Sequence, residues 1–219
     1  MGPVPAFAGK KLPKTLNMLQ KKQPLRVVFF GDSILSGQNA SSLFHCAPFT
    51  PTFAELFIEK LKRVYGYEGI EAFNTSVGGM DSAWGVGNAE QRVAAYDPDL
   101  CVIGFGMNDH FSKEQEEQHI RTIIETAREK NPNMEAILLS SHLPNPDSGN
   151  FAGDVAGFAE VFRKISEDIP GVAVAPMTAM HTYMLTRKRY LDMSGNGINH
   201  PNDFLIRVHA QCLVQCVVE

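Results

Sequence analysis

Short apolar runs alternate with longer amphipathic stretches from residue 26 onward. The short runs predict strands at residues 26–30, 70–74, 100–105, 136–140 and 172–175, of which 26–30 and 100–105 are expected to be buried. Apolar residues at helical spacing predict helices at residues 52–65, 89–96, 113–130, 154–167, 176–189 and 202–217. Strands separated by helices are typical of right-handed crossovers, which build parallel sheets. The pattern therefore predicts an α/β fold with a mostly parallel, five-stranded sheet covered by helices on both faces.

Loops at one edge of this sheet are the expected place for chemistry. In parallel α/β sheets, functional sites lie at the carboxyl ends of the strands. The loops that leave those ends are residues 31–51, 75–88, 106–112 and 141–153. Any segment near the C-terminus that returns to the same edge belongs with them.

The composition of the chain argues against nucleic acids and membranes as partners. The chain has 219 residues, 44% hydrophobic and 20% charged, with a net charge of −4. Such a balance gives no general attraction to nucleic acid or to anionic membranes, and no apolar run reaches the roughly 18 residues of a transmembrane helix. We therefore expect a soluble protein, either cytoplasmic or secreted, with no nucleic-acid or membrane partner.

Positive charge is concentrated at the N-terminus. Residues 1–26 hold six lysines and arginines and no acidic residue. We expect residues 1–25 to be a basic arm or the remnant of a linker, and residues 26–219 to be one folded domain.

Neither the cysteines nor the histidines have the spacing of a metal site. The four cysteines show no CxxC pair, so free and mostly buried thiols are expected at Cys46, Cys101, Cys212 and Cys216. The histidines and carboxylates do not cluster at ligand spacing, and the glycine-rich segments lack the end of a phosphate-binding loop. No metal and no cofactor is predicted.

A serine follows the first predicted strand directly. The strand ends in Gly31-Asp32-Ser33, which places the Ser33 hydroxyl on a tight turn at the edge of the sheet. A serine nucleophile also needs a neighbouring base and donors for an oxyanion. Ser33 alone therefore proves little, because serine and aspartate are common turn residues.

Three further segments supply these missing groups. The loop after the second strand holds the glycine pair Gly78-Gly79, where backbone N–H groups can turn into a site. The third strand ends in a segment that offers the Asn108 side-chain amide. Near the C-terminus, His200 stands between a glycine-rich loop and Pro201, and a histidine presented in this way is a reasonable base.

Taken together, the four segments resemble the GDSL or SGNH family of serine hydrolases. The matches are Gly31-Asp32-Ser33, residues 74–82, residues 106–109 and His200-Pro201, in the family's order. The resemblance implies a flavodoxin-like three-layer α/β/α sandwich and a catalytic domain over residues 26–219. It also implies Ser33 as nucleophile, His200 as general base, and Gly79 and Asn108 as oxyanion donors together with the Ser33 N–H.

The chain departs from the family at the acid of the triad. The family usually has an aspartate three residues before the histidine, where this sequence has Gly197 preceded by Asn196. Asp192 is the nearest upstream carboxylate, and it reaches His200 if residues 194–199 fold back. Asp203 is the nearest downstream carboxylate, although its place before a helix favours a capping role. A Ser-His dyad and a neutral amide at Asn196 remain as alternatives, and we lean slightly to Asp192.

The loops around Ser33 suggest a small acyl group. They are short and polar and offer no broad hydrophobic lid. The candidates for an apolar or sugar-stacking rim are Asn39, Phe44, His45, Phe49, Phe53 and Trp84. About half of them are expected to pack on the sheet instead, with Phe53 in the core. We expect a serine esterase that hydrolyses acetyl esters on a carbohydrate through a covalent acyl-enzyme. Stretches at residues 74–85 and 190–207 also resemble bacterial SGNH esterases that carry an accessory β-domain upstream. The alternatives are a lysophospholipase or thioesterase of the same family, and a non-catalytic carbohydrate-binding relative.

Overall fold

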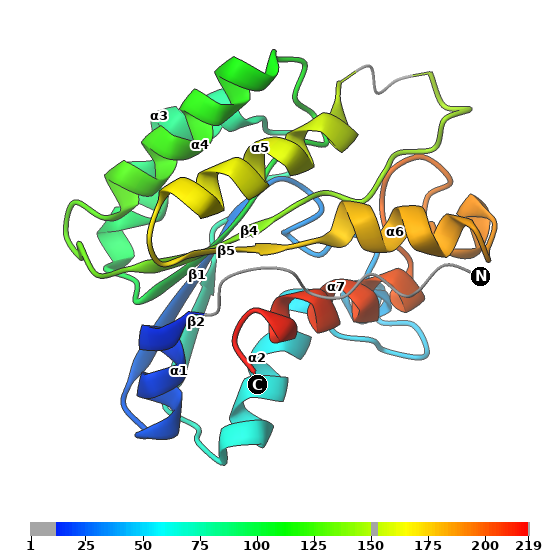
Figure 1. The fold of residues 1–219 in the computed structure, drawn as a ribbon. Coiled ribbons are helices and arrows are strands. Elements are labelled where there is room, and N and C mark those ends of the chain that lie inside the picture. The colour runs from blue at the N-terminus through cyan, green and yellow to red at the C-terminus, as the bar shows by residue number, and fades with distance from the viewer. Residues whose placement is uncertain (1–11, 150–152, 219) are drawn as a thin grey trace.

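A parallel sheet lies at the centre of the computed structural model, which describes residues 12–149 and 153–218 (Figure 1). Its strands are β1 (Leu25–Gly31), β2 (Ile70–Asn74), β3 (Leu100–Gly104), β4 (Glu135–Leu139) and β5 (Val172–Ala175). They pair in the order β2-β1-β3-β4-β5, and every neighbouring pair is parallel. The predicted α/β fold is confirmed, and each strand begins and ends within one residue of its expected bounds.

Helices cover both faces of this sheet (Figure 1). One face packs against α3 (Ser82–Arg92), α4 (Lys113–Ala127) and α5 (Val155–Asp168). The other packs against α1 (Pro13–Gln20), α2 (Phe53–Tyr65), α6 (Met177–Leu185) and α7 (Asp203–Gln215). Because side chains alternate along a strand, Val28 and Phe30 of β1 enter the first core and Val27 and Phe29 the second. The result is the three-layer sandwich.

One helix begins earlier than the sequence pattern predicts. The expected helix at residues 89–96 is α3 followed by the short η2 turn (Ala94–Tyr96), and α3 starts at Ser82. Asp81 caps it, since its carboxylate accepts the Trp84 N–H at 2.8 Å. The start of α3 is hard to predict from the sequence because Gly85 disfavours a helix. In the structure, a Cβ at residue 85 would lie 2.8 Å from the Phe105 ring. Close packing therefore requires glycine inside this helix.

The described part of the expected N-terminal arm is packed against the domain. Leu12, directly before α1, and Leu19, within α1, are both fully buried. The backbone N–H groups of Lys14 and Thr15 donate to the Glu135 carboxylate at 3.1 and 2.8 Å. Residues 12–20 thus belong to the folded domain, and residues 1–11 lie outside the described part of the chain.

The described helices include none that is long and apolar enough to cross a membrane.

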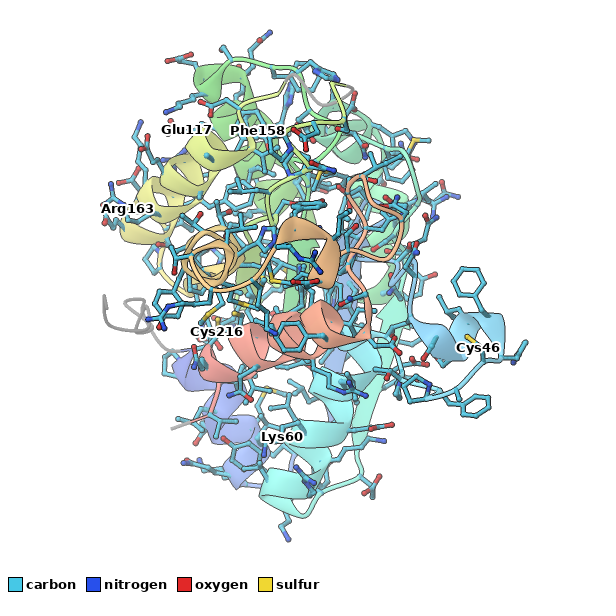
Figure 2. The ribbon with its side chains drawn as sticks, turned by 90° about the vertical axis from the view of Figure 1, so that its right-hand side faces the viewer. Cys46, Lys60, Glu117, Phe158, Arg163 and Cys216 are labelled. Carbon is cyan, nitrogen blue, oxygen red and sulfur yellow. The ribbon has the colours of Figure 1, made fainter. Side chains whose placement is uncertain are left out.

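All four cysteines are free thiols, and three of them are buried. The fourth, Cys46, is exposed just after the short η1 turn (Ser41–Phe44), in a loop that projects from the side of the molecule (Figure 2).

Candidate active site

Ser33 lies where β1 gives way to a tight turn. The turn is closed by Ser36 N–H donating to the Asp32 carbonyl and by the Ile34 N–H donating to the Asp32 carboxylate at 2.8 Å. Gly31 must be glycine, because a Cβ at this position would lie 2.1 Å from the Gly104 carbonyl oxygen of β3. The close approach of β1 and β3 thus fixes where the Ser33 side chain leaves the sheet.

The structure brings Ser33 and His200 together across 167 residues of sequence. Ser33 Oγ lies 3.0 Å from His200 Nε2, a hydrogen-bond distance. Ser33 is 5% exposed and His200 is half-buried. Burial lowers the pKa of His200 below its ordinary value, so its imidazole is neutral near pH 7. A neutral imidazole in contact with a serine hydroxyl is one requirement of nucleophilic catalysis.

His200 is held by a closed loop between η3 (Tyr190–Asp192) and α7. Gly195 N–H donates to the His200 carbonyl at 2.8 Å, and a bridge joins Ser194 to Pro201. Asn202 then caps α7 by accepting two backbone N–H groups. These bonds therefore hold the loop, and with it His200, in one conformation.

The two candidate carboxylates for the triad are engaged elsewhere. The Asp192 carboxylate accepts the Arg189 guanidinium at 2.8 Å and the Arg189 backbone N–H at 3.1 Å, and these bonds lower its pKa. Asp203 accepts the Ser41 backbone N–H at 3.0 Å. His200 Nδ1 instead faces the Asn196 side-chain nitrogen at 3.2 Å. The structure thus does not bring Asp192 to His200, and it places a neutral amide where the family has an acid.

Asp192→Asn is accordingly expected to change kcat by less than about 3-fold, because its carboxylate bonds an exposed arginine rather than the base. Steady-state hydrolysis of a chromogenic acetate ester measures this. A loss of about 100-fold or more would show that Asp192 serves His200 during turnover.

The expected oxyanion donors come from two loops that are tied to each other. Gly79 has a positive φ of 79°, and a Cβ at the neighbouring Gly78 would lie 3.6 Å from Ser33 Cβ. The Asn108 amide donates one hydrogen to the Met80 carbonyl at 3.0 Å. An amide has two hydrogens, so the second remains for a ligand. The glycine loop therefore lies beside Ser33, and Asn108 is hydrogen-bonded to that loop.

Asp109 strengthens the tie between these loops. It is fully buried, and its two carboxylate oxygens accept the backbone N–H groups of Ser82 and Gly106, each at 2.7 Å. Two further buried acids stand nearby. Burial and the Asp109 charge raise the pKa of Asp32 to about 7 and that of Glu116 to about 9. Glu116 accepts the Ser82 hydroxyl at 2.6 Å, so it takes part in the same network.

Glu116 gives the fold a pH dependence that can be measured. Its pKa rises from 4.5 to about 9 on folding, so between these values the folded protein binds more protons than the unfolded chain. Stability therefore falls as pH rises through this range. Glu116→Gln should make the decline in the free energy of unfolding between about pH 6 and about pH 8.5 shallower, as measured by urea unfolding.

The control is Glu125→Gln, which changes an exposed glutamate on the same helix. It should leave the pH dependence of unfolding as in the parent protein. Equal slopes for Glu116→Gln and the parent would show that Glu116 is ionised in the folded state.

Sequence reasoning missed a buried histidine cluster behind the His200 loop. His142 Nε2 lies 2.7 Å from the Asn199 carbonyl, and His209 Nε2 lies 3.2 Å from His142 Nδ1. His181 Nδ1 accepts the Leu143 N–H at 3.1 Å. Burial lowers the pKa of all three, so they are neutral. His142 supports the loop directly through its bond to Asn199, and His209 supports it through His142. The residues are too far apart in the sequence for any spacing signal to reveal them.

The aromatic residues expected around the site divide into two groups. Phe44 and Phe49 are exposed, at 64% and 60%, on the projecting loop that carries Cys46 (Figure 2). Phe53 is fully buried and stacks on His209 with ring centroids 4.9 Å apart, so it belongs to the core. Within the described residues, no group of histidine, cysteine and carboxylate side chains could hold a metal ion.

Comparisons with solved structures agree with this fold. A two-domain esterase active on acetylated mannans superposes with a TM-score of 0.73 at 17% identity, covering 96% of this chain and 54% of that one. This chain thus spans about half the length of that esterase. An acetyl xylan esterase from Geobacillus stearothermophilus superposes with a TM-score of 0.71 at 18% identity, covering 89% of this chain and 94% of that one.

Sequence comparison identifies the family. No curated protein matches the chain significantly. The family model for the GDSL-like lipase/acylhydrolase family matches residues 29–204, which include Ser33, Gly79, Asn108 and His200. Since the match covers most of the sequence, the chain belongs to the GDSL-like lipase/acylhydrolase family of hydrolases.

Proposed function

We propose that the protein is a serine esterase that removes acetyl groups from a carbohydrate through a covalent acyl-enzyme. The observation that carries the proposal is the 3.0 Å contact between Ser33 Oγ and His200 Nε2 at the carboxyl end of β1. Nucleophile and base in hydrogen-bond contact, with amide donors beside them, are the requirements of acyl transfer.

The proposed reaction has two halves. Ser33 Oγ attacks the ester carbonyl carbon while its proton passes to His200 Nε2. The negative charge that forms on the carbonyl oxygen is stabilised by the Asn108 amide and by the Gly79 and Ser33 backbone N–H groups. The alcohol then leaves with the proton from His200, and the acyl group stays on Ser33. Water, activated by His200 in the same way, releases the acid and restores the serine.

A shallow depression beside the His200 loop supports a carbohydrate as the alcohol. It is lined by exposed aromatic and polar groups, including Asn39, Phe44, Gly195 and Phe204. Phe44 and Phe204 are 64% and 40% exposed, and exposed apolar side chains grouped next to polar ones are typical of binding surfaces. Two structural neighbours, the esterase active on acetylated mannans and the acetyl xylan esterase, support the same kind of alcohol.

The test is a comparison of substrates. Chromogenic acetate, butyrate and octanoate esters report the preferred acyl length, and acetate release from acetylated xylan, acetylated mannan and a lysophospholipid reports the alcohol. We expect the acetate ester and an acetylated polysaccharide to be preferred. Preference for octanoate and the lysophospholipid would favour a lipid substrate, and binding of polysaccharide without turnover would favour a non-catalytic relative.

A further inference from the structure

The orientation of the Asn196 side chain is fixed by its own loop. Its Oδ1 accepts three backbone N–H groups, those of Ile198 at 2.9 Å, Asn199 at 2.9 Å and His200 at 3.0 Å. Backbone N–H groups only donate, so the atom that faces them must be the oxygen. A flipped amide would oppose three donors with its own two hydrogens. The amide nitrogen therefore points the other way, toward His200.

This orientation decides which nitrogen of His200 carries the proton. Asn196 Nδ2 lies 3.2 Å from His200 Nδ1 and 3.0 Å from Asn199 Oδ1, so each of its hydrogens has an acceptor. His200 Nδ1 must then be the unprotonated nitrogen of the neutral ring. The ring proton lies on Nε2 and is directed at Ser33 Oγ, 3.0 Å away.

That tautomer is the reverse of the one that acyl transfer uses. To accept the Ser33 proton, His200 needs a free lone pair on Nε2 and its own proton on Nδ1. With the proton on Nδ1, two donors would face each other across the contact with Asn196. The described residues place no carboxylate on the ring, because Asp192 bonds Arg189 and Asp203 bonds Ser41. Among the described residues, neither of these carboxylates therefore stabilises the imidazolium that forms during turnover.

We propose that Asn196 is a positioning residue that holds the resting base in its Nε2–H tautomer, so that the chain's own amide limits its esterase rate. The inference rests on the proposed function for its effect on rate, and on geometry alone for the tautomer. Before Ser33 can be deprotonated, the ring proton must move from Nε2 to Nδ1. The hydrogen bond that the Asn196 amide donates to Nδ1 must break at the same time. Only the small population that has done so can react.

The proposal predicts a gain of function. In Asn196→Asp, one carboxylate oxygen keeps the three backbone N–H groups and the other accepts a proton-bearing Nδ1. The Asn199 amide, whose oxygen accepts from Asn196 in the parent, turns to present its nitrogen to that second oxygen. This completes a Ser-His-Asp triad with an aspartate four residues before the histidine. Exchanging aspartate for asparagine in such triads lowers kcat by about 10⁴, so the reverse exchange should raise kcat by roughly 30-fold or more. The acid limb of the kcat/KM profile should also move to higher pH, because a carboxylate raises the pKa of His200.

The tautomer itself is read without activity. Long-range ¹H–¹⁵N correlations of histidine-labelled protein distinguish a protonated Nε2 from a protonated Nδ1, and the His200 signals are assigned by their loss in His200→Gln. We expect Nε2–H in the parent protein and Nδ1–H in Asn196→Asp. Gln211→Glu, which adds the same charge on the exposed side of α7, should change neither the spectrum nor the rate. Asn196→Asp combined with Ser33→Ala should be inactive, which would place the gain at Ser33.

Two results would overturn the inference: an Nδ1–H signal for His200 in the parent protein, or a folded Asn196→Asp variant that hydrolyses acetate esters no faster than the parent. Absence of turnover in both proteins, with the expected pair of tautomers, would instead overturn the proposed function and leave the assignment of the proton standing.

Discussion

Ser33→Ala is expected to lower ester hydrolysis by at least about 1,000-fold while leaving the free energy of unfolding within about 1 kcal/mol of the parent. The activity is lost because the acyl-enzyme forms on Ser33 Oγ. The fold is kept because that hydroxyl bonds only to the His200 ring among the described residues, and its removal leaves no cavity of consequence. Hydrolysis of a chromogenic acetate ester and urea unfolding measure the two quantities.

The matched control is Ser42→Ala, which removes a hydroxyl from the same β1–α2 connection. Ser42 Oγ has no hydrogen-bond partner among the described residues, so its loss should alter the rate by less than about 3-fold. A serine-directed fluorophosphonate should add its mass to the parent and to Ser42→Ala but not to Ser33→Ala. Turnover above about 1% in Ser33→Ala would place the nucleophile elsewhere.

Strands β1, β3, β4 and β5 were predictable because nearly all of their residues are buried, so these strands appear in the sequence as short apolar runs. Helices were less predictable where tertiary packing overrides the helix propensity of the local sequence. Gly85 disguises the first turn of α3, and the lysines around α1 disguise the burial of Leu12 and Leu19. In both places the contact that stabilises the helix comes from a distant strand or helix, which a local pattern does not contain.

The same division applies to the site. Ser33, His200, Gly79 and Asn108 follow from motif order and from the rule that parallel strands present their loops at one edge. The partner of His200 does not follow, because it depends on how residues 194–199 close. Because Asn196 Oδ1 accepts three backbone N–H groups, the nitrogen of the same amide must face His200. Asp192 is turned away by its bonds to Arg189, a local contact that no spacing predicts.

Asn108→Ala is expected to lower kcat by roughly 100-fold to 1,000-fold with little change in KM. In the proposed mechanism, the Asn108 amide acts on charge that is present in the transition state and absent from the bound ester, so its loss should raise the barrier without weakening substrate binding. Steady-state kinetics with a chromogenic acetate ester separate the two constants. A phosphonate or boronate that mimics the tetrahedral intermediate should lose affinity in proportion to the loss of kcat/KM.

Asn108 also donates to the Met80 carbonyl, so the loss must be separated from a loosening of the glycine loop. Asn88→Ala supplies the comparison, because Asn88 makes the same kind of amide-to-carbonyl bond, to Trp84 at 2.8 Å, on α3. Asn88→Ala should lower the free energy of unfolding as Asn108→Ala does, and it should leave kcat nearly unchanged. If Asn108→Ala instead raises KM alone, the amide binds the substrate in its ground state. The charge on the intermediate must then be stabilised by the Gly79 and Ser33 N–H groups without it.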